Sequence, residues 1–453
     1  MNVEKKVTTT YIKRKKPASY ESLLSDIQQA QTRDLWELTS SNLSQEEKKE
    51  KVIAFIKKQI RDKNIHYDSI SSDELVTILY NDIEGFSILQ PYIDDHGVEG
   101  ININAWNNIR VKLHGGGEIR GESFNSPTHA KVIIDRLLSA SGVKIDDAIP
   151  TAEGSLGSNI RITAVISPIV DKDIGVAVYI RKLRDTVFTT NEYVEKDFAT
   201  EEVLNTIHIC VKRGTSTLFL GKVNTGKTTL VKHALDCLPD EMQIITIESG
   251  AREMNLVKYD EEGTPINNVV HMLTREHEDE AMNITQEKLV VKALRLNPDI
   301  LSVAEMRDTE AYAAIESSNS GHTVVSTAHA GSVRYGHKRI ANLSRKKYAM
   351  DPHTALIDAC EAFPLGVFIH TTEDGVRRIM NVSECYVDGN DTVHYNTLWE
   401  FRVQENKKNA DGTVSVIGEY VQANNPSEYL IERMKMYGIT NDELNSLFKG
   451  GNQ

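Results

Sequence analysis

The stretch Gly221 to Leu230, GKVNTGKTTL, constrains the fold of this chain more than any other short segment. It fits the pattern G-x-x-x-x-G-K-[ST] in full. An apolar run, Thr217 to Leu220, precedes it, and a segment with a helical pattern, Thr228 to Leu238, follows it. A strand before the loop and a helix after it are the context in which this motif binds phosphate. The stretch therefore predicts an α/β domain built on a parallel sheet.

The loop offers the groups that hold a polyphosphate and its metal ion. Backbone N–H groups of such a loop wrap the phosphates, and the start of the following helix faces their negative charge. Lys227 is expected to reach the β and γ phosphates, and the hydroxyl of Thr228 is expected to ligate Mg²⁺. The residues expected to bind the nucleotide here are Gly221, Asn224, Thr225, Gly226, Lys227, Thr228 and Thr229.

Short apolar runs alternate with helical segments after the loop, at Gln243–Ile247, Ile300–Val303 and Thr323–Thr327. In open α/β sheets, ligands bind outside the carboxyl ends of the strands, so Glu305 is expected to meet the phosphates. There it would orient or polarise the attacking water, and a capping or solvated glutamate is the alternative. Glu248 ends the first run at the same edge, where it would hold Mg²⁺ through water or have a structural role.

Two histidines flank the last apolar run, in NSGHTVVSTAHAG from Asn319 to Gly331. A zinc site needs three or four convergent ligands, and an odd offset along a strand puts His322 and His329 on opposite faces. None of the four cysteines lies within metal-motif spacing of either histidine or of another cysteine. A metal site is therefore the weakest interpretation, and a buried structural role or a role beside a ligand both stay open.

Composition limits the class of protein. The 453 residues are 40% hydrophobic and 26% charged, which is ordinary for a water-soluble protein of two or three domains. A net charge of −13 argues against a general nucleic-acid coat, because the phosphate backbone demands a basic face. The sequence has no run of about 18 apolar residues and no signal-peptide core, and its unpatterned cysteines fit a reducing compartment. We expect a cytoplasmic protein.

Shifts in composition predict three parts. Residues 1–75 are a basic arm, which includes YIKRKKPAS, and a helical extension that begins at the capping box of Ser44 and Glu47. The arm is a solubilising tail or, alternatively, a membrane-surface or partner attachment. Residues 76–190 have the pattern of an α+β domain with a mostly antiparallel sheet. Residues 191–453 carry the alternating pattern of a doubly wound, mainly parallel sheet, and residues 185–200 read as a polar connector.

An LSGGQ-like transporter signature and the Asn-Lys-x-Asp of Ras-like GTPases are both missing from the sequence, which leaves a RecA-like motor. The segments IESGAREMNL, PDILSVAEMRDTEA and NSGHTVVSTAHAGS follow the loop in that order. They resemble the acidic box, Walker B motif and histidine box of the type II/type IV secretion ATPases. Upstream, IEGFSILQPYIDDHGVEGININ, IDDAIPTAEGSLGSNIRITAV and VAVYIRK are similar to the N-terminal domain of that family, especially in its pilus-assembly and conjugation branch.

The resemblance covers residues from about 80 to about 390. It implies a Mg²⁺-dependent ATPase that forms a homo-hexamer and powers a secretion, conjugation or pilus-assembly machine at the inner face of the membrane. The implied partners are inner-membrane secretion or pilus platform proteins, with a peripheral membrane contact. The C-terminal part would then be a RecA-like ATPase domain followed by a C-terminal subdomain.

The resemblance also assigns roles to individual residues. It implies that His322 and His329 lie beside the nucleotide and link the state of the γ-phosphate to motion between domains. Four arginines match family arginines near the nucleotide, and an interdomain salt bridge is the alternative for each. The expected catalytic residues are Glu305, Lys227, His329, His322 and Arg307, and the arginines expected to help bind ATP are Arg161, Arg181 and Arg275.

The chain also departs from the family pattern. Ser249 stands where the family usually has aspartate, and Ala304 and Asp308 replace glycines on either side of Glu305. Residues 334–347, RYGHKRIANLSRKK, are unusually basic. Two rival hypotheses therefore stay open. One is a RecA-like ATPase that translocates DNA through this basic stretch, and the other is a nucleotide-gated scaffold that does not hydrolyse ATP.

Overall fold

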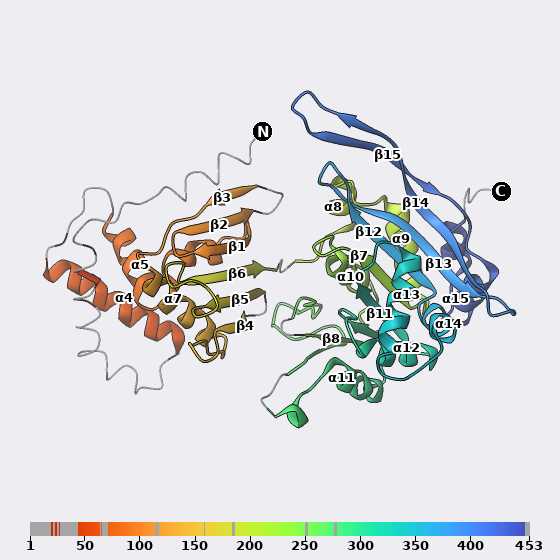
Figure 1. Cartoon of the computed structure of the whole chain (residues 1–453), viewed down its shortest axis with the longest axis horizontal. Coiled ribbons are helices and arrows are strands. Elements are labelled where there is room, and N and C mark those ends of the chain that lie inside the picture. Colours follow the sequence, from red (N-terminus) through yellow and green to blue (C-terminus); the bar gives the residue numbers. More distant parts are fainter. Residues whose placement is uncertain are drawn as a thin grey trace. The chain divides into compact units, whose positions relative to one another are not determined.

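The computed structural model divides the chain into two compact units, residues 1–184 and 185–453 (Figure 1). The basic segment YIKRKKPAS and the glycine turn at residues 114–116 lie outside the described residues. The three-part division of the chain stays a prediction. The structure describes residues 44–63, 65, 71–113, 117–157, 159–183, 186–249, 252–275 and 279–448, together with Tyr20, Leu23, Leu24 and Ile27.

The first unit contains a sheet of antiparallel strands in the order β3-β2-β1-β6-β5-β4. Buried and less buried residues alternate along β5 and β6, so one face of the sheet is the core face. Helix α7 (Pro127–Ala140) covers that core with its apolar side. The strands are β1 (Val98–Ala105), β2 (Asn108–Leu113), β3 (Glu118–Arg120), β4 (Thr151–Leu156), β5 (Ile160–Ile166) and β6 (Val176–Lys182).

A separate helical cluster precedes this sheet in the sequence. The predicted capping box is confirmed: the hydroxyl of Ser44 accepts from the N–H of Glu47, and the carboxylate of Glu47 accepts from the N–H of Ser44. Helix α4 (Gln45–Asp62) then packs its apolar stripe against α5 (Ser72–Ile83) in a buried cluster of its own. The short elements η1 (Ser87–Leu89) and α6 (Gln90–Asp94) lead from α5 into β1.

The second unit is built on one mixed sheet in the order β15-β14-β13-β12-β7-β11-β10-β8-β9. The strands from β12 to β9 run parallel, and β13, β14 and β15 continue the sheet in antiparallel fashion. The strands are β7 (Thr217–Gly221), β8 (Ile244–Glu248), β9 (Val269–Leu273), β10 (Ile300–Val303), β11 (Thr323–Ala328), β12 (Leu365–Thr371), β13 (Arg377–Val387), β14 (Val393–Lys408) and β15 (Val414–Gln422).

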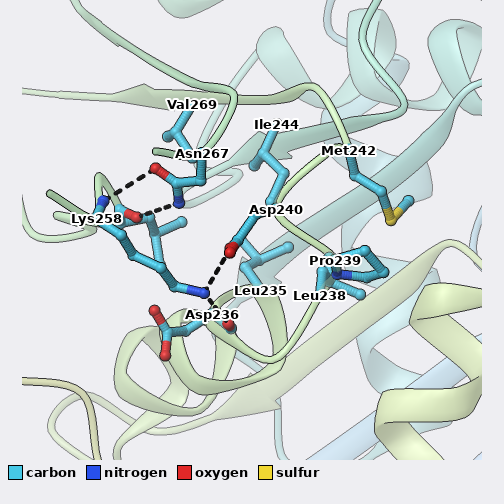
Figure 2. Close-up of a pocket in the computed structure, with 11 residues that line it drawn as sticks. Leu235, Asp236, Leu238, Pro239, Asp240, Met242, Ile244, Lys258, Asn267 and Val269 are labelled. Atoms are coloured by element: carbon cyan, nitrogen blue, oxygen red, sulfur yellow. Dashed lines mark hydrogen bonds and ion pairs between the residues drawn. The ribbon is translucent and has the colours of Figure 1, made fainter. Parts of the chain in front are cut away.

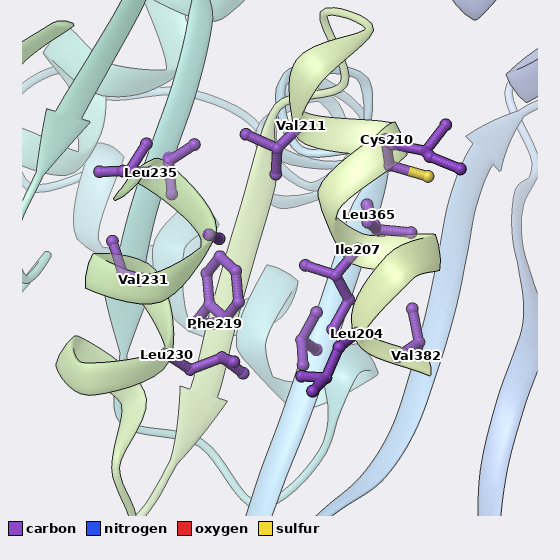
Figure 3. Packing of buried hydrophobic residues seen from close by; sticks show 14 of the residues in the cluster. Leu204, Ile207, Cys210, Val211, Phe219, Leu230, Val231, Leu235, Leu365 and Val382 are labelled. Carbon is purple, nitrogen blue, oxygen red and sulfur yellow. The ribbon is translucent and has the colours of Figure 1, made fainter. Parts of the chain in front are cut away.

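Helices cover both faces of this sheet. Strands β7, β8, β10 and β11 are buried along their whole length, which explains their unbroken apolar sequences. One face packs against α9 (Glu201–Lys212), α10 (Lys227–Asp236) and α15 (Glu428–Met436), and Figure 3 shows Phe219 of β7 in that layer. The other face packs against α11 (Gln286–Ala293), α12 (Glu310–Asn319), α13 (Val333–Ser344) and α14 (Pro352–Ala362). The predicted α/β class is confirmed.

The interpretation of residues 185–200 as a polar connector was incomplete. This segment contains α8 (Thr190–Glu195), which a capping box stabilises: Thr189 and Glu192 exchange side-chain and backbone hydrogen bonds. The short helical elements η2 (Glu280–Met282) and η3 (Leu294–Leu296) lie on either side of α11. Within the described part of the chain, no helix is both long and apolar enough to cross a membrane.

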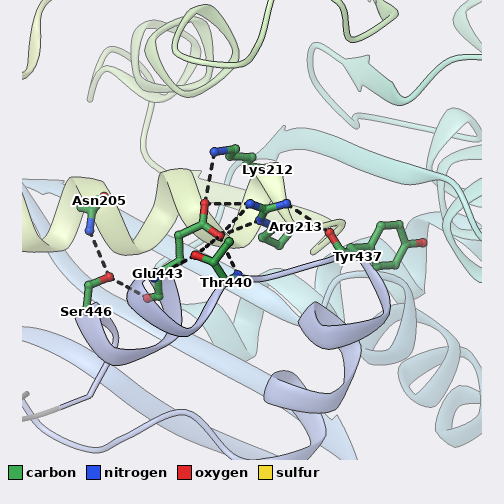
Figure 4. Close-up of polar contacts among 7 residues, drawn as sticks. All are labelled: Asn205, Lys212, Arg213, Tyr437, Thr440, Glu443 and Ser446. Atoms are coloured by element: carbon green, nitrogen blue, oxygen red, sulfur yellow. Dashed lines mark hydrogen bonds and ion pairs between the residues drawn. The ribbon is translucent and has the colours of Figure 1, made fainter.

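The C-terminal helix α16 (Asn441–Ser446) is linked to α9 by the hydrogen bonds that the carboxylate of Glu443 accepts (Figure 4). Glu443 accepts two hydrogen bonds from the Nη2 of Arg213, at 2.7 and 2.9 Å, and one from Lys212 at 3.1 Å. Burial alone raises the pKa of Glu443, but hydrogen bonds from the Thr440 N–H, Lys212 and Arg213 lower it from 4.5 to about 2. The ionised form therefore holds α16 in place.

We expect Glu443→Gln to weaken the docking of α16 at pH 7, by about 1.5–3 kcal/mol for hydrogen bonds to a charged group. Because the pKa is lowered on folding, this stabilisation is present above pH 4.5 and is lost as the pH falls toward 2. Hydrogen exchange of the α16 amides at a series of pH values measures the effect. Glu432→Gln, an exposed change on α15, is the control. Equal α16 protection in wild type and Glu443→Gln at pH 7 would contradict the assignment.

Candidate nucleotide-binding site

The loop between β7 and α10 has a backbone that suits glycine at two positions. At Gly226 the φ angle is 95°, in the left-handed region that glycine adopts without strain. At Gly221 a Cβ atom would lie only 2.4 Å from the carbonyl oxygen of Ile369 in β12 and 2.6 Å from the hydroxyl of Thr225. The Thr225 hydroxyl also donates to the carbonyl of Lys222 at 3.0 Å, which closes the loop on itself.

Lys227 places its ammonium group inside this loop. Its Nζ lies 3.2 Å from the carbonyl oxygen of Gly221, 2.8 Å from that of Lys222 and 3.1 Å from Nδ1 of His329. An ammonium has three N–H donors, so these three acceptors use all of them. Burial lowers the pKa of Lys227 to about 8, although the negative charge of Glu305 offsets part of this effect. The amino group is therefore mostly protonated at neutral pH.

Glu305 stands at the carboxyl edge of the same sheet, as predicted. Strand β10 ends at Val303, and the next residue, Ala304, is held on both sides. Its N–H donates to the carbonyl of Ile247 at 2.9 Å, and its carbonyl accepts from the hydroxyl of Thr327 at 2.6 Å. These bonds to the ends of β8 and β11 fix the backbone next to Glu305.

A chain of close contacts joins Glu305 to Lys227. Oε1 of Glu305 lies 2.8 Å from Nε2 of His329, and Nδ1 of the same ring lies 3.1 Å from Nζ of Lys227. Nδ1 also lies 3.1 Å from the carbonyl oxygen of Gly221, so this nitrogen contacts both the ammonium of Lys227 and a carbonyl of the loop. Oε2 of Glu305 accepts a hydrogen bond from Nη2 of Arg307 at 2.6 Å. The structure therefore brings Lys227, His329, Glu305 and Arg307 together at one edge of the sheet.

The surroundings of Glu305 keep it ionised. Burial by itself raises its pKa, but the hydrogen bond and charge of Arg307, with the charges of His329 and Lys227, lower the pKa below its ordinary value. Its side chain is 19% exposed. The 2.8 Å approach of His329 is poorly directed, and Oε1 receives no well-aligned hydrogen bond from the described residues. Oε1 is itself buried, so the exposed part of the side chain lies elsewhere.

Glu310 also helps to position residues at the carboxyl edge of the sheet, and the sequence analysis did not identify it. Its carboxylate accepts hydrogen bonds from the backbone N–H groups of Arg307 and Asp308, the latter at 2.7 Å. This closes the turn between β10 and α12 and presents the Arg307 side chain to Glu305. The sequence did contain a signal for this role, because Glu310 is an acidic residue in the first turn of a helix and directly follows Asp308 and Thr309.

Glu248 lies at the end of β8 and is 1% exposed. Its Oε1 accepts from the backbone N–H groups of Glu253 and Met254, at 2.8 and 3.0 Å. The contacts are those of a carboxylate that caps the loop following β8. This is the structural role that sequence reasoning left open, and the Mg²⁺ role stays a prediction.

His322 is not at this edge. It precedes β11, whereas His329 follows it, and β11 runs parallel to β7. The whole strand, roughly 20 Å at about 3.3 Å per residue, therefore separates the two histidines. Nδ1 of His322 lies 3.4 Å from the hydroxyl of Ser320. The structure places only His329 at the edge of the phosphate-binding loop, and the expectation that the two histidines lie beside the nucleotide stays a prediction.

The other predicted residues are spread over both units. Thr228 and Thr229 are half-buried in the first turn of α10, and Asn224 is exposed in the loop with a φ of 64°. Arg275 is exposed beyond β9, where its backbone pairs with Ile284. Arg161 and Arg181 face each other across β5 and β6 of the first unit. Their contacts with a nucleotide stay predictions.

A cavity beyond the C-terminal end of α10 offers no rival site (Figure 2). Its volume of about 10 Å³ accommodates at most one water molecule. The amino group of Lys258 in its wall donates to the carboxylate of Asp240 at 2.8 Å and to the carbonyl of Asp236 at 3.1 Å. This polar group is already paired within the protein.

Comparison with known proteins adds a family match. Residues 124–411, more than half of the chain, match the model of a family described as type II/IV secretion system protein. The matched range includes the phosphate-binding loop, Glu305 and His329.

Individual relatives are more distant. The chain is 28% identical over 268 residues to an uncharacterized protein of Methanocaldococcus jannaschii, which is 58% of this chain and 46% of that protein. The chain thus spans less than half the length of that relative. It is 27% identical over 306 residues to the type IV secretion system protein VirB11 of Bartonella quintana, 57% of this chain and 79% of that protein. A solved structure, the VirB11 ATPase from the Brucella suis type IV secretion system in complex with sulphate, is 21% identical with a TM-score of 0.34. That match covers 67% of this chain and 96% of that chain.

Proposed function

The chain belongs to the type II/IV secretion system protein family, and from this premise we propose that it is a Mg²⁺-dependent, RecA-like ATPase motor. It works in the cytoplasm as a homo-hexamer and powers a type IV secretion, conjugation or pilus-assembly machine. Its partners are inner-membrane secretion or pilus platform proteins, reached through a peripheral contact with the cytoplasmic face of the membrane. The observation that carries the proposal is the contact chain from Lys227 through His329 to Glu305 and Arg307.

The chemistry of this contact chain supports hydrolysis. The β and γ phosphates of ATP lie against the loop and the start of α10, where Lys227 exchanges its bonds to loop carbonyls for phosphate oxygens. Glu305 is ionised, and its carboxylate orients or polarises the attacking water. Arg307 and Lys227 supply positive charge on either side of that carboxylate, where negative charge develops on the transferred phosphoryl group.

The residues at this edge fit Mg²⁺, which takes hard oxygen ligands. Thr228 offers a hydroxyl at the first turn of α10. Because Oε1 of Glu248 already accepts two N–H groups, that carboxylate would act on the ion only through water. An ion held there would neutralise part of the charge of the phosphates.

Release of inorganic phosphate from ATP tests the proposal directly. The full-length protein should release phosphate in the presence of Mg²⁺, and a chelator of divalent cations should stop the release. Tight ATP binding without phosphate release would favour the nucleotide-gated scaffold, which the changes at Ser249, Ala304 and Asp308 motivate.

We expect a closed ring in solution, because a motor of this kind completes its site across a subunit boundary and cyclic symmetry satisfies every interface. Light scattering of the purified chain with ATP and Mg²⁺ should give a mass of about six chains, because the family resemblance implies a hexamer. The same measurement without nucleotide is the control for ligand-dependent assembly. A strictly monomeric mass under both conditions would count heavily against the ring.

His329→Ala and His322→Ala form a matched pair, because the two side chains stand at opposite ends of one strand. His329→Ala removes the common partner of Lys227 and Glu305, so we expect kcat for ATP to fall at least about tenfold, below the usual range for a direct acid or base. His322→Ala should change kcat by less than about twofold, as surface substitutions usually do. Steady-state phosphate release measures both. Equal losses in the two variants would show that His322 also acts at a nucleotide.

A DNA-translocating ATPase is a second candidate, and one surface favours it. Helix α13 exposes Arg334, Lys338 and Arg339. Two further lysines of the basic stretch are neutralised, since Lys346 pairs with Asp308 and Lys347 with Glu287, each at 2.9 Å. Strong stimulation of phosphate release by DNA, with a steep dependence on salt, would favour this candidate over a secretion or pilus motor.

A further inference from the structure

Three side chains that are far apart in the sequence converge in the core of the second unit. His337 lies on α13, Cys360 on α14 and Cys385 on β13, at spacings of 23 and 25 residues. One ligand atom from each lies within 4.8 Å of the other two, and all three residues are at most 1% exposed. Spacing along the sequence could not reveal this group, because each member comes from a different element.

Both ring nitrogens of His337 lie against backbone carbonyl oxygens. Nε2 lies 2.8 Å from the carbonyl oxygen of Phe363, and Nδ1 lies 3.2 Å from that of Val333. A neutral imidazole carries only one hydrogen, so it can donate to only one of these carbonyls. The other nitrogen keeps its lone pair and would exchange its carbonyl contact for an ion. Histidines that bind metals usually donate their other N–H to a carbonyl or carboxylate in this way.

Tyr395 completes the surroundings of the cluster. It stands directly opposite Cys385 in the β13–β14 ladder, and its hydroxyl lies 3.6 Å from Sγ of Cys360. Its ring centroid is 5.6 Å from that of His337. The hydroxyl is therefore placed to donate to a thiolate of Cys360, or to take the fourth position around an ion held by the other three residues.

The dimensions suit a tetrahedral metal site. With bonds of about 2.0–2.3 Å to nitrogen and sulfur, the ligand atoms around a tetrahedral zinc ion lie about 3.3–3.8 Å apart. The atoms of this cluster are separated by at most 4.8 Å, so an ion would draw them together by about 1.5 Å or less. Two thiolates and a neutral imidazole balance the charge of a divalent cation, which suits a fully buried position. Thiolate and imidazole ligands select zinc over Mg²⁺ or Ca²⁺.

We propose that His337, Cys360 and Cys385 bind a structural Zn²⁺ ion, with Tyr395 beside the fourth position. Binding displaces one proton from each thiol to solvent and involves no change of oxidation state. The ion would cross-link α13, α14 and β13. Since α13 begins at Val333, four residues after His329, the metal would fix the helix that follows the histidine of the candidate nucleotide site.

Metal analysis of the untagged, full-length wild-type protein is the first test, because it needs no variant to fold. After purification in reductant without chelator, we expect one zinc ion per chain. Removal of the metal and addition of Co²⁺ should produce a sulfur-to-cobalt charge-transfer band and the intense visible bands of a tetrahedral site. Only a trace of zinc, together with no sulfur-to-cobalt band after loading, would overturn the proposal.

Variants locate the ion. Cys360→Ser and Cys385→Ser should each lose the zinc and the charge-transfer band, and added zinc should no longer raise their thermal midpoint. Cys237→Ser, which changes an exposed thiol, should keep all three properties. Lys227→Ala should keep them too, because this metal is not at the phosphate-binding loop. Retention of zinc in both cluster variants, or a Cys360–Cys385 disulfide in the reduced wild-type protein, would refute the assignment.

Discussion

Lys227→Ala is expected to abolish tight binding of ATP by the full-length protein. In the structure the ammonium sits inside the loop on three acceptors, so it is positioned before any phosphate arrives. Each hydrogen bond to a charged group contributes about 1.5–3 kcal/mol, and the lysine makes two or more to the β and γ oxygens. The loss should therefore be at least about a hundredfold in Kd, at about 1.4 kcal/mol per tenfold. Titration calorimetry with Mg-ATP measures it.

Lys222→Ala provides a matched control. It removes the same charge from an exposed position in the same loop, and only its backbone carbonyl contacts Lys227. Its expected loss of affinity is much smaller than that of Lys227→Ala. Similar losses in the two variants would mean that the loop attracts ATP by its general charge. Unchanged affinity in Lys227→Ala would remove the central claim about this loop.

The fold was predictable where burial imposes an unbroken apolar pattern. Strands β7, β10 and β11 lie inside a parallel sheet, so both of their faces are apolar and their short sequences stand out. Strand β9 was missed because it lies at the end of the sheet and none of its residues is fully buried. Helix α8 was missed because it is short and polar, and a capping box at Thr189 stabilises it instead of a long apolar face.

The candidate site was predictable to the extent that motifs fix residues to strand ends. Lys227 and Glu305 follow buried strands of known direction, so both had to appear at the carboxyl edge. The two histidines share one motif, and the motif does not show that a complete strand separates them. The partners of Glu248 in the loop after β8, and the convergence of His337 with two cysteines, depend on contacts between elements that no local pattern encodes.

Glu305→Gln is expected to lower the turnover of ATP by at least about a hundredfold while leaving ATP affinity within a few-fold of wild type. The change keeps the shape of the side chain and removes its charge. A positioned acid or base is typically worth about 10² to 10⁴ in rate, or roughly 3 to 5 kcal/mol of barrier at about 1.36 kcal/mol per tenfold. Affinity should be spared because Lys227, and not Glu305, is expected to contact the phosphates in the ground state. Phosphate release and calorimetry separate the two effects.

The contacts of Glu305 in the structure indicate what this variant keeps and what it loses. Glutamine can still accept a hydrogen bond from Arg307 through its amide oxygen, but it lacks the charge of the carboxylate that is expected to orient water. Glu316→Gln, an exposed change farther along α12, controls for the general loss of one negative charge. In a ring, mixing Glu305→Gln subunits with wild type should also depress wild-type turnover. If Glu305→Gln hydrolyses ATP normally, another residue positions the water, and the proposal that the carboxyl end of β10 is the catalytic edge is wrong.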